Sequence, residues 1–236
     1  MSKSEPEFDQ FSESYPQLLR DPIRDRFAPG GTEFFHLRKR DVIGNYFRSR
    51  QMDARKLAYL DLGCGRGELA SLLRNDFARV AGCDTSAAML RAGDLTSKGI
   101  ETRLQDDPGR IPFDTAEFDF VTAICLFYHV PLWARVALLH EACRVLKRGG
   151  TLAIIEHNPY NPMTRLIVSR TPVDAGAALL RPAETRRLLR EAGLTVDEQL
   201  HFLYFPAAVY QRLNRIESAL AKVPFGGQCA VFGRSA

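Results

Sequence analysis

The sequence has few features of a secreted or membrane-spanning protein. Its five cysteines are odd in number, widely scattered and never spaced as CxxC, which argues against a disulfide framework or a zinc site. No stretch reaches the ~18 consecutive apolar residues that a membrane span needs, and no apolar run follows the polar, acidic first ten residues. We therefore expect free thiols, no signal peptide, no transmembrane segment and a cytoplasmic location.

A strong excess of one charge is also absent. Lys and Arg number 32 and Asp and Glu number 28, so the net charge is only +4, which permits nucleic acid or anionic surfaces without requiring them. Internal repeats and low-complexity segments are missing too. With 45% hydrophobic and 25% charged residues, the composition excludes disordered, collagen-like and coiled-coil proteins. The 236 residues suit one large α/β domain, alone or with additions.

Short apolar runs alternate with stretches of helical period from residue 57 onward, which indicates a parallel sheet flanked by helices. The expected strands are 57–62, 79–83, 100–104, 118–126, 151–155, 196–205 and 228–232. The expected helices are 69–77, 86–98, 132–146, 182–193 and 209–220. Residues 156–180, rich in proline and asparagine, are expected to form a long loop. Residues 1–50 carry no strand signal and are expected to form an N-terminal helical cap of one or two helices, followed by the main domain at 51–236.

The most informative segment is a strand that runs into a glycine-rich turn and then a helix, Asp61-Leu62-Gly63-Cys64-Gly65-Arg66-Gly67-Glu68. The dinucleotide fingerprint GxGxxG requires a small residue at position 68, where helix and strand touch. Glu68 does not meet that requirement, so an NAD site is the weaker interpretation. Asp61, two residues before the first glycine, instead suits a cationic amino group near the turn.

Two further acids follow the next expected strands. Asp84 lies 19 residues after Gly65, at a strand end where a carboxylate can accept both hydroxyls of a ribose. A third acid, Asp106 or Asp107, follows the third expected strand. Acids for an amine, a ribose and an adenine on consecutive strand ends describe an adenosine with an amino-acid tail, which is S-adenosylmethionine.

These residues belong to five ordered blocks, LDLGCGRGELA, AGCDTS, DDPGRIPF, FDFVTAICLFYHV and EACRVLKRGGTLAIIE. In these blocks the sequence resembles the class I S-adenosylmethionine-dependent methyltransferases, in particular the small-molecule group labelled type 11. The resemblance implies a Rossmann-like α/β fold with a seven-stranded, mostly parallel sheet, an antiparallel last strand and helices on both faces. It makes 51–236 the cofactor-binding methyltransferase domain. The cofactor contacts it implies are Asp61, Gly63, Cys64, Gly65, Gly67, Asp84, Thr85, Asp106 or Asp107, Ile124 and Leu126.

The sequence leaves the adenine-facing acid open. The family spacing selects Asp107, which lies five residues before the Pro-Phe pair. The backbone N–H that the family then places on the adenine ring would come from Pro108, and proline has none. With Asp106 as the acid, the amide of Asp107 supplies that donor, so both residues remain candidates.

The acceptor side of the expected site is less sharply defined. His129 follows the fourth strand and His157 the fifth, so either histidine is a candidate general base. Tyr128, Asn158, Asn161 and Tyr15 are candidate acceptor contacts. Each also has a structural interpretation, as a loop-ordering, lid-stiffening or cap-packing residue.

We expect methyl transfer from S-adenosylmethionine to a small-molecule or lipid-like acceptor, without a metal. Nucleic acid is not the expected partner, because the Asn/Asp-Pro-Pro-aromatic motif of amino-methylating nucleic-acid enzymes is missing at 126–129. The alternatives are a module that binds S-adenosylmethionine without turnover and an NAD-dependent oxidoreductase. Neither the acceptor atom nor the oligomeric state follows from the sequence.

Overall fold

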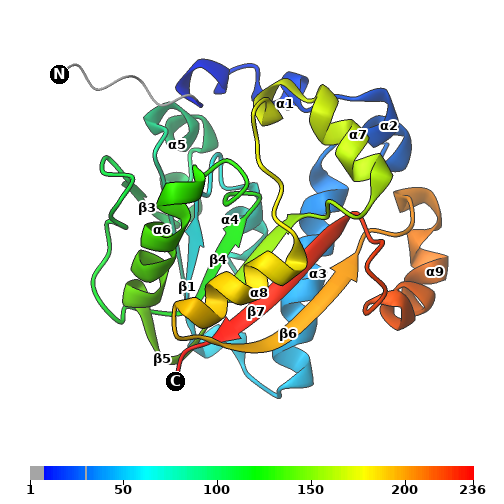
Figure 1. Ribbon diagram of the computed structural model, residues 1–236. Coiled ribbons are helices and arrows are strands. Elements are labelled where there is room, and N and C mark those ends of the chain that lie inside the picture. Colours follow the sequence, from blue (N-terminus) through cyan, green and yellow to red (C-terminus); the bar gives the residue numbers. More distant parts are fainter. Residues whose placement is uncertain (1–7, 30) are drawn as a thin grey trace.

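The computed structural model describes residues 8–29 and 31–236, and its centre is a seven-stranded sheet in the order β3-β2-β1-β4-β5-β7-β6 (Figure 1). Strands β1 to β5 pair in parallel, whereas β7 runs antiparallel to both β5 and β6. This arrangement confirms the predicted fold class. The strands are β1 (Ala58–Leu62), β2 (Arg79–Asp84), β3 (Glu101–Leu104), β4 (Phe118–Ile124), β5 (Leu146–His157), β6 (Thr195–Phe202) and β7 (Gln228–Arg234).

Helices cover both faces of this sheet and one of its edges (Figure 1). The α-helices are α1 (Tyr15–Leu18), α2 (Pro22–Phe27), α3 (Glu33–Ser49), α4 (Glu68–Leu73), α5 (Ala87–Gly93), α6 (Leu132–Val145), α7 (Pro162–Arg170), α8 (Pro182–Glu191) and α9 (Ala207–Leu220). Short 3₁₀ turns are η1 (Asp9–Phe11), η2 (Ala54–Lys56), η3 (Thr96–Lys98) and η4 (Pro172–Asp174). None of the helices in residues 8–29 and 31–236 has the length and apolarity that a bilayer crossing requires.

The strands are apolar on both faces because each face packs against its own helices. Leu60 and Val121 lie in the core that α6 and α8 cover. Tyr59 and Phe120 point the other way and pack with α3 and α4. The ring of Phe47 from α3 lies 5.0 Å from that of Phe120, so α3 is part of the sheet's own core although it precedes residue 50.

The structure differs from the predicted elements in several places. The helix expected at 86–98 ends at Gly93, β5 begins at Leu146 instead of 151, and β6 ends at Phe202 instead of 205. The stretch expected to be a loop contains α7, because the Asn161 side chain accepts the Thr164 N–H at 2.9 Å and Pro162 occupies the first turn. β4 ends at Ile124, two residues early, because Cys125 has a left-handed backbone with φ of 50°. The N-terminal part has three α-helices instead of one or two.

The segment before α3 lies at the carboxyl edge of the sheet. Figure 1 shows α1 and α2 beside α7 at this edge, above the ends of the central strands. Asp9 ties the segment to α5, since its Oδ1 accepts hydrogen bonds from the Ser86 hydroxyl at 2.5 Å and the Ala88 N–H at 3.1 Å. Residues 8–28 therefore cover the end of the sheet where α/β folds bind ligands. Residues 1–7 of the expected cap lie outside the described part.

Candidate active site

One cavity of about 1190 Å³ opens at the carboxyl edge of the sheet and brings the predicted acids together. Asp61 at the end of β1, Asp84 at the end of β2 and Asp106 after β3 all line it. The other predicted residues on its wall are Gly63, Cys64, Gly65, Thr85, Ile124, Leu126, Tyr15, Tyr128, His129, His157 and Asn161. Ligand pockets commonly measure ~300–1,000 Å³, so this cavity has room for two molecules at once.

The glycine turn is shaped for close contact with a ligand. Gly65 has a left-handed φ of 55°, and a Cβ added there would meet no atom within 4 Å, because it would point into open space. Its N–H donates to Asp84 Oδ2 at 2.8 Å, while Asp84 Oδ1 accepts from the Ser86 N–H at 2.8 Å. Burial raises the pKa of Asp84 above its usual value. Two backbone bonds thus fix this carboxylate at the cavity wall, where further lone pairs can accept from a diol.

Asp61 is a buried acid that forms no ion pair with another described residue. Only 4% of the residue is exposed, and its Oδ1 accepts the Thr122 hydroxyl at 2.8 Å. Burial raises its pKa from 3.8 to about 6. A positively charged amino group would offset this penalty, so the observation fits the tail of S-adenosylmethionine.

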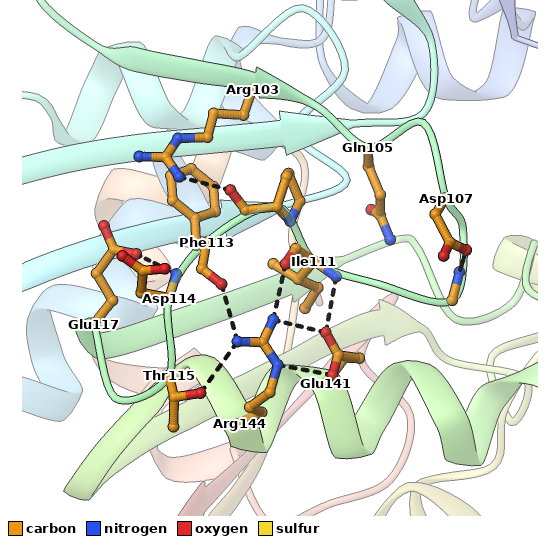
Figure 2. A network of polar contacts seen from close by, with 12 residues as sticks. Arg103, Gln105, Asp107, Ile111, Phe113, Asp114, Thr115, Glu117, Glu141 and Arg144 are labelled. Atoms are coloured by element: carbon orange, nitrogen blue, oxygen red, sulfur yellow. Dashed lines mark hydrogen bonds and ion pairs between the residues drawn. The ribbon is translucent and has the colours of Figure 1, made fainter.

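The structure separates the two candidates for the adenine-facing acid. Asp106 lines the cavity, whereas Asp107 turns to its own loop, where its Oδ1 accepts the Gly109 N–H at 2.8 Å. Figure 2 shows the Asp107 carboxylate within this turn, at the hydrogen bond that closes it. This placement agrees with the hydrogen-bond argument for Asp106 and not with the family spacing.

An arginine clamp holds the loop that carries Asp106 (Figure 2). The Arg144 guanidinium on α6 donates to the carbonyl oxygens of Ile111 and Phe113, each at 2.9 Å. Glu141 pairs with Arg144 at 2.7 Å, and its Oε2 also accepts the Ile111 N–H at 3.0 Å. A planar fork that satisfies two carbonyls at once fixes the loop in one conformation.

Gly67 does not lie on the cavity wall, and its glycine requirement has a packing origin. It has φ of 69° at the start of α4, and a Cβ there would approach Leu95 Cδ1 to 2.4 Å. Gly67 therefore allows the turn to pack closely against the segment after α5, in place of the cofactor contact predicted from the sequence.

The wall after β4 is held from behind by a buried acid. Glu156 on β5 is 3% exposed, and its Oε1 accepts the N–H groups of Leu126 and Phe127 at 3.1 and 2.8 Å. Burial raises its pKa well above the usual value. Glu156 thus satisfies two amides that the left-handed Cys125 leaves outside the sheet ladder.

The cavity continues past this wall into a chamber beneath the N-terminal helices, which we call the acceptor chamber. Its polar side chains are Tyr15, Tyr128, His129, His157 and Asp174. Its apolar wall is formed by Phe8, Leu19, Phe27, Phe35, Ile167 and Leu203. The Tyr128 hydroxyl donates to Asp174 Oδ1 at 2.6 Å, and the ring of His129 lies between those of Tyr128 and Phe8, at 4.0 and 5.0 Å.

The titratable groups of the acceptor chamber are strongly affected by burial. Burial lowers the pKa of His157 to about 4, so its imidazole is neutral at physiological pH. Burial also raises the pKa values of Tyr15 and Tyr128, so both hydroxyls keep their protons and act as donors. The chamber therefore combines the neutral side chains of His157, Tyr15 and Tyr128 with the carboxyl group of Asp174 and the guanidinium group of Arg24.

Asn158 and Asn161 serve the protein's own backbone. Asn158 is fully buried; its Nδ2 donates to the carbonyls of Pro224 and Gly226 at 3.0 and 2.8 Å, and its Oδ1 accepts the Tyr160 N–H. The predicted acceptor contact at Asn158 is therefore replaced by a structural link between two loops. Asn161 lines the cavity, but both ends of its amide serve the protein's backbone. Its Nδ2 donates to the Phe225 carbonyl at 2.7 Å, and its Oδ1 accepts the Thr164 N–H and so caps the first turn of α7.

Sequence reasoning missed several residues of this cavity. Lys39 on α3 is 6% exposed, lines the cavity and forms no ion pair within the described chain. Asp174 was part of the expected loop, Asp9 lay in no motif, and Glu156 ended the last of the five blocks without an assigned role. A lysine in a helix that otherwise packs in the core was the one available signal, because lysine is rarely buried without a function.

Comparisons with known proteins agree with this geometry. A family model described as "Methyltransferase domain" matches residues 60–154. A ubiquinone biosynthesis O-methyltransferase of Thiobacillus denitrificans is 31% identical over 66% of this chain and 72% of its own length. A 2-phytyl-1,4-naphtoquinone methyltransferase of Synechococcus elongatus is 32% identical over 68% and 73%. Among solved structures, magnesium protoporphyrin IX methyltransferase of Synechocystis, with bound S-adenosylhomocysteine, superposes with a TM-score of 0.65 over 97% of each chain at 15% identity.

Proposed function

Because this chain belongs to the class I S-adenosylmethionine-dependent methyltransferases and methylates a small molecule, we propose that its acceptor is a hydroxylated, largely apolar ring compound methylated on oxygen. The observation that carries the proposal is the acceptor chamber. It continues the cavity of the three acids and combines an aromatic and aliphatic wall with a small group of buried polar side chains. A flat apolar ring with one or two hydroxyl groups matches such a lining.

The names of two relatives support this acceptor class. One is called a ubiquinone biosynthesis O-methyltransferase and the other a 2-phytyl-1,4-naphtoquinone methyltransferase. Both names refer to quinones, which are ring compounds, and the first also specifies methylation on oxygen. Under our proposal the ring lies among Tyr15, Tyr128 and His129, and an apolar substituent lies along Leu19, Phe27 and Ile167.

The donor half of the cavity has a proposed contact for each part of S-adenosylmethionine. Asp61 would receive the amino group, Asp84 the ribose hydroxyls and Asp106 the adenine edge. Lys39 supports a further assignment, because its buried ammonium group lies on the cavity wall and lowers the pKa of Asp61 through its charge. We assign it to the carboxylate of the methionine tail.

When bound, S-adenosylmethionine supplies an electrophilic methyl group on positively charged sulfur. The chain then has to place the acceptor oxygen in line with the methyl carbon and keep water out, which is worth up to ~7–11 kcal/mol of barrier. The N-terminal helices would close the chamber, and the hydrogen bonds that Asp9 accepts from Ser86 and Ala88 would fasten them to the start of α5.

Removal of the hydroxyl proton is the second task of the chain. We assign it to His129, which lines the chamber and whose Nε2 lies 3.6 Å from Asp174 Oδ1. A positioned base contributes typically ~10²–10⁴-fold. His157 is the weaker candidate, because the low pKa that burial gives it makes its imidazole a poor proton acceptor near neutral pH.

A cytoplasmic location is also part of this proposal. The five cysteines are unpaired, which supports a reducing compartment such as the cytoplasm.

The test is methyl transfer to matched acceptors. Catechol, a naphthohydroquinone and veratrole, which is catechol with both hydroxyls already methylated, are incubated with enzyme and S-adenosylmethionine, and products are identified by mass spectrometry. We expect methyl ethers from the hydroxylated compounds and none from veratrole. Methyl transfer only to amines would refute the oxygen-acceptor proposal while leaving the methyltransferase assignment intact.

A further inference from the structure

Asp174 is a buried carboxylate at the inner end of the acceptor chamber. It closes η4, only 5% of the residue is exposed, and it lines the cavity. Its Oδ1 accepts the Tyr128 hydroxyl at 2.6 Å and lies 3.6 Å from His129 Nε2. Its Oδ2 has no hydrogen-bond partner among the described residues. A carboxylate is expensive to bury with so few partners, which suggests that its position serves the reaction.

The backbone around Asp174 holds this carboxylate in place. The Asp174 N–H donates to the Thr171 carbonyl at 3.0 Å, and the Asp174 carbonyl accepts the Ala177 N–H at 3.0 Å. One residue further, the Ala178 N–H donates to the Tyr128 carbonyl at 2.8 Å, which joins this turn to the loop that carries His129. The distance between carboxylate and imidazole is therefore determined by two connected loops and not by flexible side chains alone.

We propose, on the basis of the function assigned above, that Asp174 is a positioning residue that keeps the His129 imidazole in the tautomer and orientation that accept the acceptor's hydroxyl proton. Under this proposal the ring proton sits on Nε2, which lies 3.6 Å from the carboxylate, and Nδ1 is the nitrogen that takes a proton. A buried carboxylate next to Nε2 also stabilises the imidazolium that forms.

The step balances in atoms and charge. The acceptor oxygen forms a bond to the methyl carbon as the carbon–sulfur bond breaks, and that bond's electron pair stays on sulfur. The hydroxyl proton passes to His129 Nδ1, and solvent removes it after the product leaves. Asp174 keeps its negative charge throughout and Tyr128 keeps its proton, because burial and the adjacent Asp174 raise the pKa of its hydroxyl.

Other polar groups lie near Asp174 and His129 and also influence the titration of His129. Tyr15 and Arg24 from the N-terminal segment and His157 from β5 line the same cavity. Arg135 on α6 donates to the Val130 carbonyl at 3.0 Å and to the Ala178 carbonyl at 2.8 Å. An asparagine at position 174 keeps the shape of the side chain and removes its negative charge. D174N therefore isolates the effect of this carboxylate on His129.

The first test needs no acceptor. Nitrogen NMR of protein with isotopically labelled histidine reports the tautomer and the titration midpoint of each imidazole, and the His129 signal is assigned by its loss in H129Q. We expect wild-type His129 to carry its proton on Nε2, and D174N to move its titration midpoint to lower pH. The signal of His140, a surface residue on α6, is the internal reference.

The outcomes separate positioning from mere packing. Y128F removes the other partner of Asp174 Oδ1 and should leave the His129 tautomer unchanged. An unchanged His129 titration in folded D174N overturns the proposal. If D174N does not fold, wild-type His129 with its proton on Nδ1 overturns it, and a proton on Nε2 supports it.

The second test uses acceptors of different acidity. The nitro group makes nitrocatechol more acidic than catechol, so its methylation depends less on a base. We expect D174N to lower kcat with catechol by ~10²-fold, to lower it much less with nitrocatechol, and to leave the Kd for S-adenosylhomocysteine unchanged. Equal losses with both catechols would contradict the proposal. If wild-type enzyme methylates neither catechol, the proposed acceptor class fails, while the NMR test still decides on Asp174.

Discussion

Asp61→Asn should make the free protein more stable and its binding of the methyl donor weaker. The buried carboxylate has a pKa of about 6 in place of 3.8, so the folded state holds this proton to higher pH than the unfolded chain. The stability it contributes is complete below about pH 3.8 and is lost as the pH rises through about 6. The pKa difference corresponds, at ~1.4 kcal/mol per pH unit, to a cost of up to about 3 kcal/mol at neutral pH.

Asparagine removes this cost and keeps the hydrogen bond, because its Oδ1 can still accept the Thr122 hydroxyl. At pH 7.5 we therefore expect the Tm of D61N to exceed that of the wild type, by up to ~10 °C for a chain of this length. Below pH 4 the two proteins should unfold alike. The Kd for S-adenosylhomocysteine should rise by ~10–100-fold, since a charge-assisted bond is worth ~1.5–3 kcal/mol.

Thermal unfolding of both proteins from pH 3 to 8, with and without S-adenosylhomocysteine, measures these effects. Only the difference between the two proteins is used, because His157 has an opposite dependence. Its pKa is lowered to about 4, so its contribution to stability is present above pH ~6.5 and is lost on acidification toward 4. Asp107→Asn, an exposed acid in the neighbouring loop, is the control. The reasoning is refuted if D61N is no more stable than the wild type at pH 7.5, or binds S-adenosylhomocysteine equally well.

Four other substitutions test the geometry. Gly65→Ala and Gly193→Ala each place a Cβ at a left-handed position in open space, so each should lower the free energy of unfolding by ~1 kcal/mol. Only Gly65→Ala should abolish the binding of S-adenosylhomocysteine, measured by calorimetry. Equal binding losses would contradict the cavity assignment. A lysine at position 144 cannot donate to two carbonyl oxygens as the planar guanidinium does. In Arg144→Lys, proteolysis of the loop that carries Asp106 should therefore become faster and the KM for S-adenosylmethionine should rise. An unchanged cleavage pattern would rule out the clamp. Asn158→Ala should lower the free energy of unfolding by ~1–3 kcal/mol in urea titrations and leave the acceptor KM unchanged; a raised KM with full stability would restore its predicted acceptor role.

The strands and the cofactor turn could be predicted from sequence because their signals are local. A buried parallel strand is a continuous apolar run, and a left-handed turn needs glycine. The three acids follow from the same logic, since each directly follows a strand and parallel strands end at one edge. The sequence left Asp106 and Asp107 open, because the family spacing and the missing N–H of Pro108 favoured different residues.

The acceptor chamber could not be predicted in the same way. Asp174 and Tyr128 are 46 positions apart and meet only because η4 folds back over the loop after β4. Asn158 was misassigned because an asparagine that binds backbone carbonyls looks, in sequence, like one that binds a ligand. α7 was missed because its prolines were read as breakers, although Pro162 occupies the first turn, where its missing N–H does no harm.

The two halves of the cavity come from different stretches of chain. Residues between β1 and the end of β4 form nearly all of the donor side, whereas the chamber is built by the N-terminal helices, the loop after β4 and the segments from the end of β5 onward. Insertions, deletions or exchanges in the latter segments can thus alter which molecule is accepted without disturbing the donor contacts. During evolution, related enzymes with this architecture can therefore come to methylate different acceptors while they bind the same methyl donor.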